Sequence, residues 1–216
     1  LPPVPADVLA KLEPYFAFGR KLGSFAAQMA DGAVKEIVVG YSGDLAEGDT
    51  QPLTRYVVQG GLAHHLGSDQ VNVVNAFHLA KNRGINIVVT KSRESRGFTN
   101  LVSVTLKTSR EERLVAGTTL SGFGPRITQI DKFPIDVEPQ GHLLLVSHYD
   151  KPGIIGKVGT LLGNNDINIA TMKVGRALAG GEAIMVLTVD KDVPKDVVKQ
   201  IAALPELNSA REIRLV

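Results

Sequence analysis

Residues 148–158 have the sequence HYDKPGIIGKV, which indicates a strand that ends in a tight turn and continues as a helix. Pro152 presets the backbone for the first helical turn. The N–H groups of Gly153, Ile154 and Ile155 then have no intrahelical acceptor and lie at the positive end of the helix dipole. A small carboxylate would find hydrogen-bond donors there, and Gly153 has no side chain to keep a ligand from the backbone.

The pattern of apolar residues around this turn extends to a complete small domain. Pro139, Gln140 and Gly141 mark its boundary, so we expect one domain over residues 1–140 and a second over 141–216. The elements expected in the second domain, in chain order, are a strand at 143–149, a helix at 153–165, strands at 168–174 and 182–189, a helix at 194–204 and a strand at 210–215. This βαββαβ order is that of the ferredoxin-like fold.

Polar side chains lie beside the expected helix start. Asp150 could accept hydrogen bonds from an ammonium group, and the amide of Asn168 could serve either charge. Together with the helix N-terminus these groups match a zwitterionic amino acid. The alternative is structural: Asp150 caps the helix, Asn168 closes a turn and His148 is a half-exposed strand residue. The residues alone leave both interpretations open.

The first domain combines helices with strands that follow one another directly. Its apolar residues recur at helical spacing over 6–31, where Pro14 and Gly19 predict two short helices or one kinked helix. The further elements expected are a strand at 34–41, helices at 49–66 and 76–83, and strands at 85–90, 101–108, 113–120 and 126–130. Because the later strands have no helices between them, a mixed sheet is favoured over a doubly wound one. The chain as a whole is expected to be α+β.

Composition excludes several function classes. The chain of 216 residues has 24 Lys plus Arg against 22 Asp plus Glu, and a net charge of +2 argues against a nucleic-acid partner. There is no cysteine, which excludes disulfides, thiol catalysis and cysteine-ligated metals. No apolar run approaches the roughly 18 residues of a membrane span, so no membrane partner is expected.

Other kinds of site are not expected either. The sequence has no G-x-G-x-x-G motif that follows a strand and opens a helix, so we expect no dinucleotide-binding site. We expect no metal site, because His142 lacks an obvious third partner and the remaining histidines form no ligand grouping. The opening residues, Leu1 to Pro5, lack an initiator Met and a signal pattern, so we expect a fragment.

Two groups of motifs resemble a known family. The segment 150–158, followed by Asn168-Ile169-Ala170 and by 180–187 (GGEAIMVL), resembles an ACT domain, a small amino-acid-sensing module of biosynthetic enzymes. Residues 41–46 (YSGDLA), 71–76 (VNVVNA) and 115–119 (VAGTT) resemble the intervening domain of long-form D-3-phosphoglycerate dehydrogenases. The resemblance implies a mixed-sheet intervening domain followed by a ferredoxin-like ACT domain, which together form the regulatory part of such an enzyme.

The resemblance also implies the ligand and its residues. L-serine, or a similar small amino acid, would bind where two ACT domains meet in a homo-oligomer. Its expected contacts are the side chains of His148, Asp150 and Asn168 and the backbone of Gly153, Ile154 and Ile155. In some relatives the intervening domain holds an anion site. Arg126 is the candidate for that site here, although Glu138, where those relatives carry a basic residue, would repel a phosphate.

Catalysis would belong to a part of the enzyme absent from these residues. The parent enzyme would be cytoplasmic and would oxidise 3-phosphoglycerate with NAD at the first committed step of serine synthesis. We therefore expect no catalytic residue, cofactor or dehydrogenase activity in this chain. One alternative is the β subunit of an iron–sulfur L-serine dehydratase, but its serine-rich signature is not visible and no cysteine could ligate a cluster. A stand-alone ACT-type sensor is the other alternative.

Overall fold

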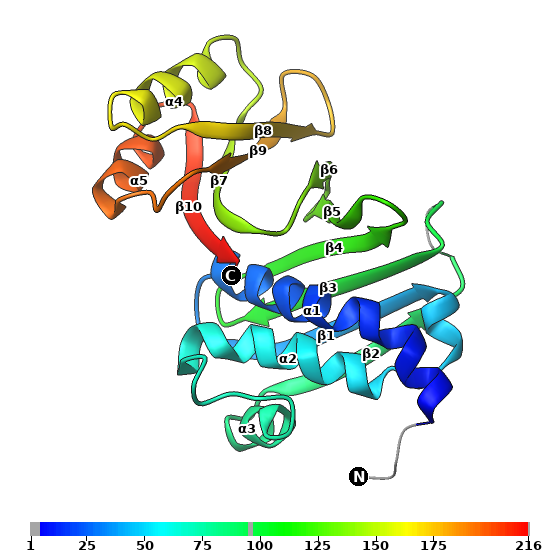
Figure 1. Cartoon of the computed structure of the whole chain (residues 1–216). Coiled ribbons are helices and arrows are strands. Elements are labelled where there is room, and N and C mark those ends of the chain that lie inside the picture. Colours follow the sequence, from blue (N-terminus) through cyan, green and yellow to red (C-terminus); the bar gives the residue numbers. More distant parts are fainter. Residues whose placement is uncertain (1–4, 95–96, 216) are drawn as a thin grey trace. The chain divides into compact units, whose positions relative to one another are not determined.

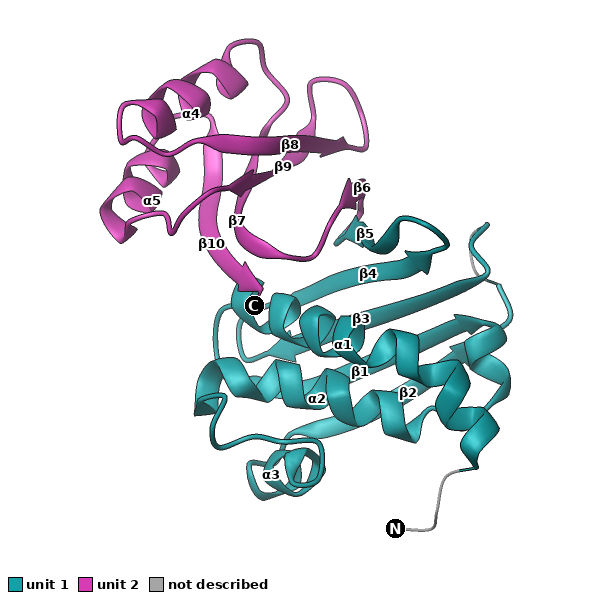
Figure 2. Cartoon of the chain, in the orientation of Figure 1, with its two compact units in different colours: residues 1–131 teal, residues 132–216 magenta. Residues whose placement is uncertain are grey.

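The computed structural model describes residues 5–94 and 97–215, so residues 1–4 of the expected fragment start lie outside it. The chain forms two compact units, residues 1–131 and 132–216, coloured separately in Figure 2. In the described part of the chain, no helix is both long and apolar enough to cross a membrane.

The first unit is a mixed sheet with helices packed against it (Figure 1). Its helices are α1 (Ala6–Met29), the short 3-10 helix η1 (Asp44–Glu47), α2 (Gln51–Leu66) and α3 (Ala76–Asn82). Its strands are β1 (Val34–Gly43), β2 (Asn86–Ser92), β3 (Asn100–Thr108), β4 (Glu112–Leu120) and β5 (Gly124–Ile130). They lie in the order β2-β1-β3-β4-β5, with β1 parallel to β2 and the other pairs antiparallel. The predicted mixed sheet is confirmed.

Helix α1 is a single helix that runs through Pro14. Proline has no N–H, so the carbonyl of Ala10 loses its usual partner. The buried face of α1 compensates through its large apolar side chains, including Leu12, Leu22 and Phe25. Each buried side chain of this kind stabilises the fold by about 1.5–3 kcal/mol, and their sum exceeds the roughly 3 kcal/mol that an interior proline costs. Burial therefore outweighs the cost of Pro14. Of the two predicted alternatives, two short helices are excluded and one continuous helix is found.

The backbones of helices α1 and α2 are in direct contact where the two helices cross. A Cβ atom on Gly23 of α1 would lie 2.0 Å from the carbonyl oxygen of Val57 on α2. A Cβ atom on Gly60 of α2 would lie 1.9 Å from the carbonyl oxygen of Arg20 on α1. Real Cβ atoms do not approach carbonyl oxygens this closely, so both positions require glycine.

A buried tyrosine ties the sheet to helix α2. Thr54 Oγ1 donates a hydrogen bond to the carbonyl of Thr50 at 2.9 Å, so its oxygen must accept the 2.8 Å bond from Tyr41 Oη. Burial raises the pKa of the Tyr41 hydroxyl above its ordinary value of 10.0. Since the unfolded tyrosine ionises first, Tyr41 contributes stability that is fully present below about pH 10 and is lost as the pH rises further.

We expect Tyr41→Phe to lower the free energy of unfolding by only about 1 kcal/mol at pH 7, because Thr54 keeps its bond to Thr50. The variant should also lose less stability than the wild-type chain between pH 8 and pH 11. Urea denaturation at both pH values checks this. Equal losses in the two proteins would show that Tyr41 does not carry the alkaline sensitivity.

The second unit has the predicted βαββαβ order. It begins with a short strand, β6 (Phe133–Val137), which the sequence did not predict. The remaining elements are β7 (Gly141–Tyr149), α4 (Ile154–Gly163), β8 (Ile169–Arg176), β9 (Glu182–Val189), α5 (Lys195–Ala202) and β10 (Leu207–Leu215). The strands form an antiparallel sheet in the order β10-β7-β9-β8 (Figure 1). The α+β fold is therefore confirmed for the chain.

Helices α4 and α5 share an apolar core with one face of this sheet. The core side chains from the sheet are Leu144, Val146, Met185, Leu187 and Val189, and those from the helices include Val158, Leu162, Val197 and Ile201. The predicted ligand-binding residues lie at or just beyond the ends of these strands. His148 is near the end of β7, Asp150 follows β7, and Asn168 precedes β8.

Candidate functional site

The predicted binding residues lie at two opposite ends of the second sheet. At one end, Tyr149 of β7 pairs with Glu182 of β9, and Arg176 of β8 pairs with Ala183. At the other end, Ile169 of β8 pairs with Val189 of β9, so Asn168 lies there. At about 3.3 Å per residue, the length of β8 separates the two ends by roughly 23 Å. One chain therefore brings His148, Asp150 and the start of α4 together, but not Asn168.

His148 is buried, with 2% of its surface exposed, so the half-exposed alternative is wrong. Its Nδ1 atom lies 2.8 Å from the carbonyl oxygen of Tyr149. A carbonyl oxygen only accepts hydrogen bonds, so Nδ1 carries a proton, and Nε2 is an acceptor in the tautomer that carries its single proton on Nδ1. Among the described residues Nε2 has no hydrogen-bond partner. An unsatisfied buried acceptor costs about 1–3 kcal/mol, which a donor on a ligand would relieve.

Asp150 binds the turn between β8 and β9. Its Oδ2 atom accepts a 2.7 Å hydrogen bond from Nη1 of Arg176 and a 3.3 Å bond from the backbone N–H of Gly180. These contacts, the Arg176 guanidinium first, hold the pKa of the Asp150 carboxyl below its ordinary value. The Asp150 side chain makes no capping bond to α4, so the capping alternative is wrong.

Helix α4 starts one residue later than predicted, and Gly153 caps it. Gly153 has a φ of +87°, a left-handed conformation that favours glycine. A Cβ atom there would meet nothing within 4 Å, so conformation rather than space explains the glycine. The N–H of Ile154 lies 3.5 Å from the carbonyl oxygen of Lys151, at the limit of a hydrogen bond. This donor, like that of the half-exposed Ile155, can still serve an anionic ligand.

Asn168 has a local partner at its own end of the sheet. Its Nδ2 atom donates a 2.7 Å hydrogen bond to Oδ2 of Asp190, and both residues are exposed. The backbone N–H of Asp190 also donates to the Asn168 carbonyl at 3.3 Å. The Asn168 side chain is thus held at the surface, away from Asp150 of the same chain.

Arg126, the candidate for an anion site, belongs to the first unit. It lies in β5 opposite Thr118 of β4. Its backbone carbonyl is so close to Gly117 that a Cβ atom on that glycine would lie 2.3 Å from the oxygen. Its backbone is therefore fixed by close strand packing. The role of its side chain in binding an anion stays a prediction.

The structure groups three residues that sequence reasoning did not connect. His142, Asp192 and Glu212 bring potential metal-ligating atoms within 4.8 Å of one another. Nδ1 of His142 lies 2.7 Å from a carboxylate oxygen of Asp192, and the Arg214 guanidinium also contacts Asp192. Because the Arg214 guanidinium contacts both Asp192 and Glu212, the cluster is best described as an ion-pair network.

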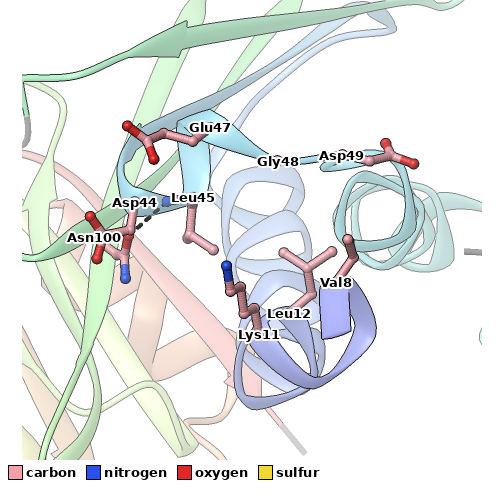
Figure 3. A pocket seen from close by; sticks show the side chains of 9 residues that line it. All are labelled: Val8, Lys11, Leu12, Asp44, Leu45, Glu47, Gly48, Asp49 and Asn100. Carbon is pink, nitrogen blue, oxygen red and sulfur yellow. Dashed lines mark hydrogen bonds between the residues drawn. The ribbon is translucent and has the colours of Figure 1, made fainter. Parts of the chain in front are cut away.

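A cavity of about 500 Å³ lies in the first unit, beside the end of β1. Figure 3 shows side chains of α1 and of η1 around it. Its charged lining residues are Lys11, Asp44, Glu47 and Asp49, and its apolar ones are Val8, Leu12 and Leu45. Three carboxylates against one ammonium disfavour an anionic ligand. The groups suited to a zwitterion are those at the start of α4.

Two family models match the chain. The D-3-phosphoglycerate dehydrogenase intervening domain matches residues 11–131, and the ACT domain matches residues 142–206. The chain is 39% identical over 215 residues to a D-3-phosphoglycerate dehydrogenase of Bacillus subtilis, and the match covers 100% of this chain and 41% of that protein. A D-3-phosphoglycerate dehydrogenase of Synechocystis is 37% identical, with 100% of this chain and 39% of that protein covered. A D-3-phosphoglycerate dehydrogenase of Methanocaldococcus jannaschii is 34% identical, and the match covers 100% of this chain and 40% of that protein. The chain thus spans about two fifths of the length of these relatives.

Proposed function

Because this chain belongs to the D-3-phosphoglycerate dehydrogenase family, we propose that it is the regulatory, amino-acid-sensing portion of such an enzyme. The parent enzyme would oxidise 3-phosphoglycerate with NAD, and L-serine, the end product of the pathway, would be the effector. The match to an ACT domain over residues 142–206 supports this proposal.

The residues of this chain do not fit NAD. Dinucleotides bind at the carboxyl ends of parallel strands, on glycine-rich turns that open a helix. The parallel pair here is β1 and β2, and β1 is followed by Asp44 and Glu47. Their carboxylates would repel a pyrophosphate. We therefore assign the nicotinamide chemistry to a part of the parent enzyme outside these residues.

The observation that carries the proposal is the grouping of His148, Asp150 and the start of α4 at one end of the sheet. The buried Nε2 atom of His148 has no hydrogen-bond partner among the described residues and would accept one from a ligand hydroxyl that reaches it. Oδ1 of Asp150 has no partner among the described residues and can accept from an ammonium group. The backbone N–H groups at the start of α4 suit a carboxylate. L-serine carries all three complementary groups: a hydroxyl, an ammonium and a carboxylate.

We propose that the site is completed by a second copy of the chain. Strand β8 is the edge of its sheet, and Ala170, Thr171 and Val174 along it are exposed. An open edge offers unpaired backbone groups to another strand. Met172 lies midway between Asn168 and Arg176 in the sequence. An antiparallel pairing centred on Met172 would place Asn168 of the partner subunit opposite Arg176, whose guanidinium contacts Asp150.

A shared site would connect effector binding to subunit arrangement. L-serine that contacts both chains favours whichever arrangement brings the two contacts together. If that arrangement disfavours the active form of the catalytic domains, feedback inhibition follows, and catalytic ligands weaken serine binding in return. The regulatory role therefore depends on the contact between the two β8 strands.

Calorimetric titration with L-serine, glycine and D-serine tests the proposal. We expect L-serine to bind most tightly, because glycine has no hydroxyl for His148 and D-serine reverses the arrangement of the three groups. Because glycine cannot make the hydrogen bond to the buried acceptor, its affinity should be about tenfold or more below that of L-serine. No heat with any of the three ligands would contradict the sensing role and leave only a scaffold role.

A further inference from the structure

We propose that Arg176 is a ligand-binding residue of the same site and selects for zwitterions. The ligand would insert between Asp150 and Arg176, so that its ammonium replaces the guanidinium on Asp150. Its carboxylate would then accept hydrogen bonds both from Arg176 and from the backbone N–H groups at the start of α4. This inference rests on the proposed amino-acid site. It adds a residue that neither the sequence motifs nor the helix N-terminus indicates.

The topology places the two charges side by side. Arg176 ends β8, and its side chain spans the intervening strand β9 to reach Asp150 after β7. Among the described residues, Asp150 is the only carboxylate that contacts this guanidinium. The ion pair uses one of the five N–H donors that the Arg176 guanidinium carries. The Arg176 side chain is 57% exposed, so its other donors can bind a carboxylate in the bidentate geometry that guanidinium groups favour.

Asp150 does not depend on Arg176 to keep its place. The backbone N–H of Asp150 donates to the carbonyl of Gly181 at 2.8 Å, and its carboxylate also accepts from the N–H of Gly180. These two bonds hold the loop after β7 to the turn between β8 and β9. Arg176 can therefore turn toward a ligand while Asp150 stays positioned.

The exchange of partners explains why a zwitterion would be preferred. An exposed ion pair contributes little net stability, so its disruption is easily offset. A zwitterion gives each charge a new partner. An amine without a carboxylate must instead compete with Arg176 for Asp150 and leaves the guanidinium without a counter-charge. An acid without an ammonium group must likewise compete with Asp150 for Arg176, and it leaves the Asp150 carboxylate without a counter-charge.

Two ligands and two variants test this assignment by NMR chemical-shift titration. The ligands are L-serine and ethanolamine, which is serine without its carboxylate. The variants are Arg176→Gln and, as a control, Lys199→Gln, which removes an exposed positive charge from α5, away from β8. Arg176→Gln should weaken L-serine binding by about tenfold to a hundredfold. It should strengthen ethanolamine binding, because the competing guanidinium is gone, whereas Lys199→Gln should leave both affinities nearly unchanged.

Opposite changes for the two ligands would support the assignment, since a purely structural role of Arg176 would weaken both. Equal weakening of both ligands, or unchanged serine binding in Arg176→Gln, would overturn the role of Arg176 and leave the amino-acid site standing. Failure of L-serine to bind the wild-type chain would overturn the amino-acid site and, with it, this inference.

Discussion

Gly60→Ala is expected to destabilise the first unit by about 3 kcal/mol, at the upper end for an overpacked contact. The added methyl group would lie 1.9 Å from the carbonyl oxygen of Arg20 and 2.9 Å from the backbone nitrogen of Ser24. Both atoms belong to the backbone of α1, so no side-chain rotation can relieve the clash. The two helices would have to separate, and apolar contacts between them would be lost.

The neighbouring glycine on the same helix provides a matched control. A Cβ atom on Gly61 would meet Ile37 Cδ1 at 3.5 Å, an ordinary van der Waals contact. Alanine is favoured over glycine inside helices by up to about 1 kcal/mol, so Gly61→Ala should be neutral or stabilising. Differential scanning calorimetry of both variants checks the contrast. Similar melting temperatures for the two variants would show that the helices do not meet backbone to backbone at Gly60.

Asp150→Ala is expected to weaken L-serine binding by about 1–3 kcal/mol, because the ligand ammonium would lose its charged acceptor. The fold should persist, since the only hydrogen bonds of this side chain within the described part of the chain are to Arg176 and to the turn at Gly180. Asp150→Asn keeps the shape of the side chain and one acceptor oxygen, so it should lower the affinity for L-serine less than Asp150→Ala does. Calorimetry gives the affinities, and circular dichroism confirms the fold. Unchanged affinity in Asp150→Ala would remove Asp150 from the site.

The same carboxylate sets the expected pH dependence of binding. The Arg176 guanidinium lowers the pKa of Asp150, so the group stays ionised from neutral pH down to its lowered pKa. The contribution of Asp150 to serine affinity should therefore stay constant as the pH falls from neutral and be lost only when the pH drops through that lowered pKa. In Arg176→Gln this loss should begin at a higher pH.

The second unit was the more predictable part of the fold. Apolar runs within residues 143–149 and 182–189 identify two of its strands, and the Pro152-Gly153 turn identifies the start of its first helix. The structure confirms these elements. Strand β6 escaped prediction because it has five residues and contains Pro134. A short strand that contains proline shows no clear alternation of apolar and polar residues. Such a strand is stabilised by its tertiary contacts more than by the intrinsic strand propensity of its residues.

The candidate site was predictable in its residues but not in their contacts. The sequence identifies Asp150 as a ligand group, yet its pairing with Arg176 depends on strand order and register. The burial of His148 likewise depends on packing against residues distant in the chain. A long cationic residue that ends a strand just before the Gly180-Gly181 turn is the one sequence signal that could have indicated Arg176.

Binding in a mixture of two defective chains tests the central claim, an effector site shared between two copies, most directly. Asp150→Ala and Asn168→Ala chains would each bind L-serine weakly alone. If each site combines Asp150 of one chain with Asn168 of the other, every mixed dimer regains one intact site. Random assortment in an equal, co-refolded mixture should then restore wild-type affinity at about a quarter of all sites. A mixture that binds no more L-serine than its two components alone would contradict a shared site.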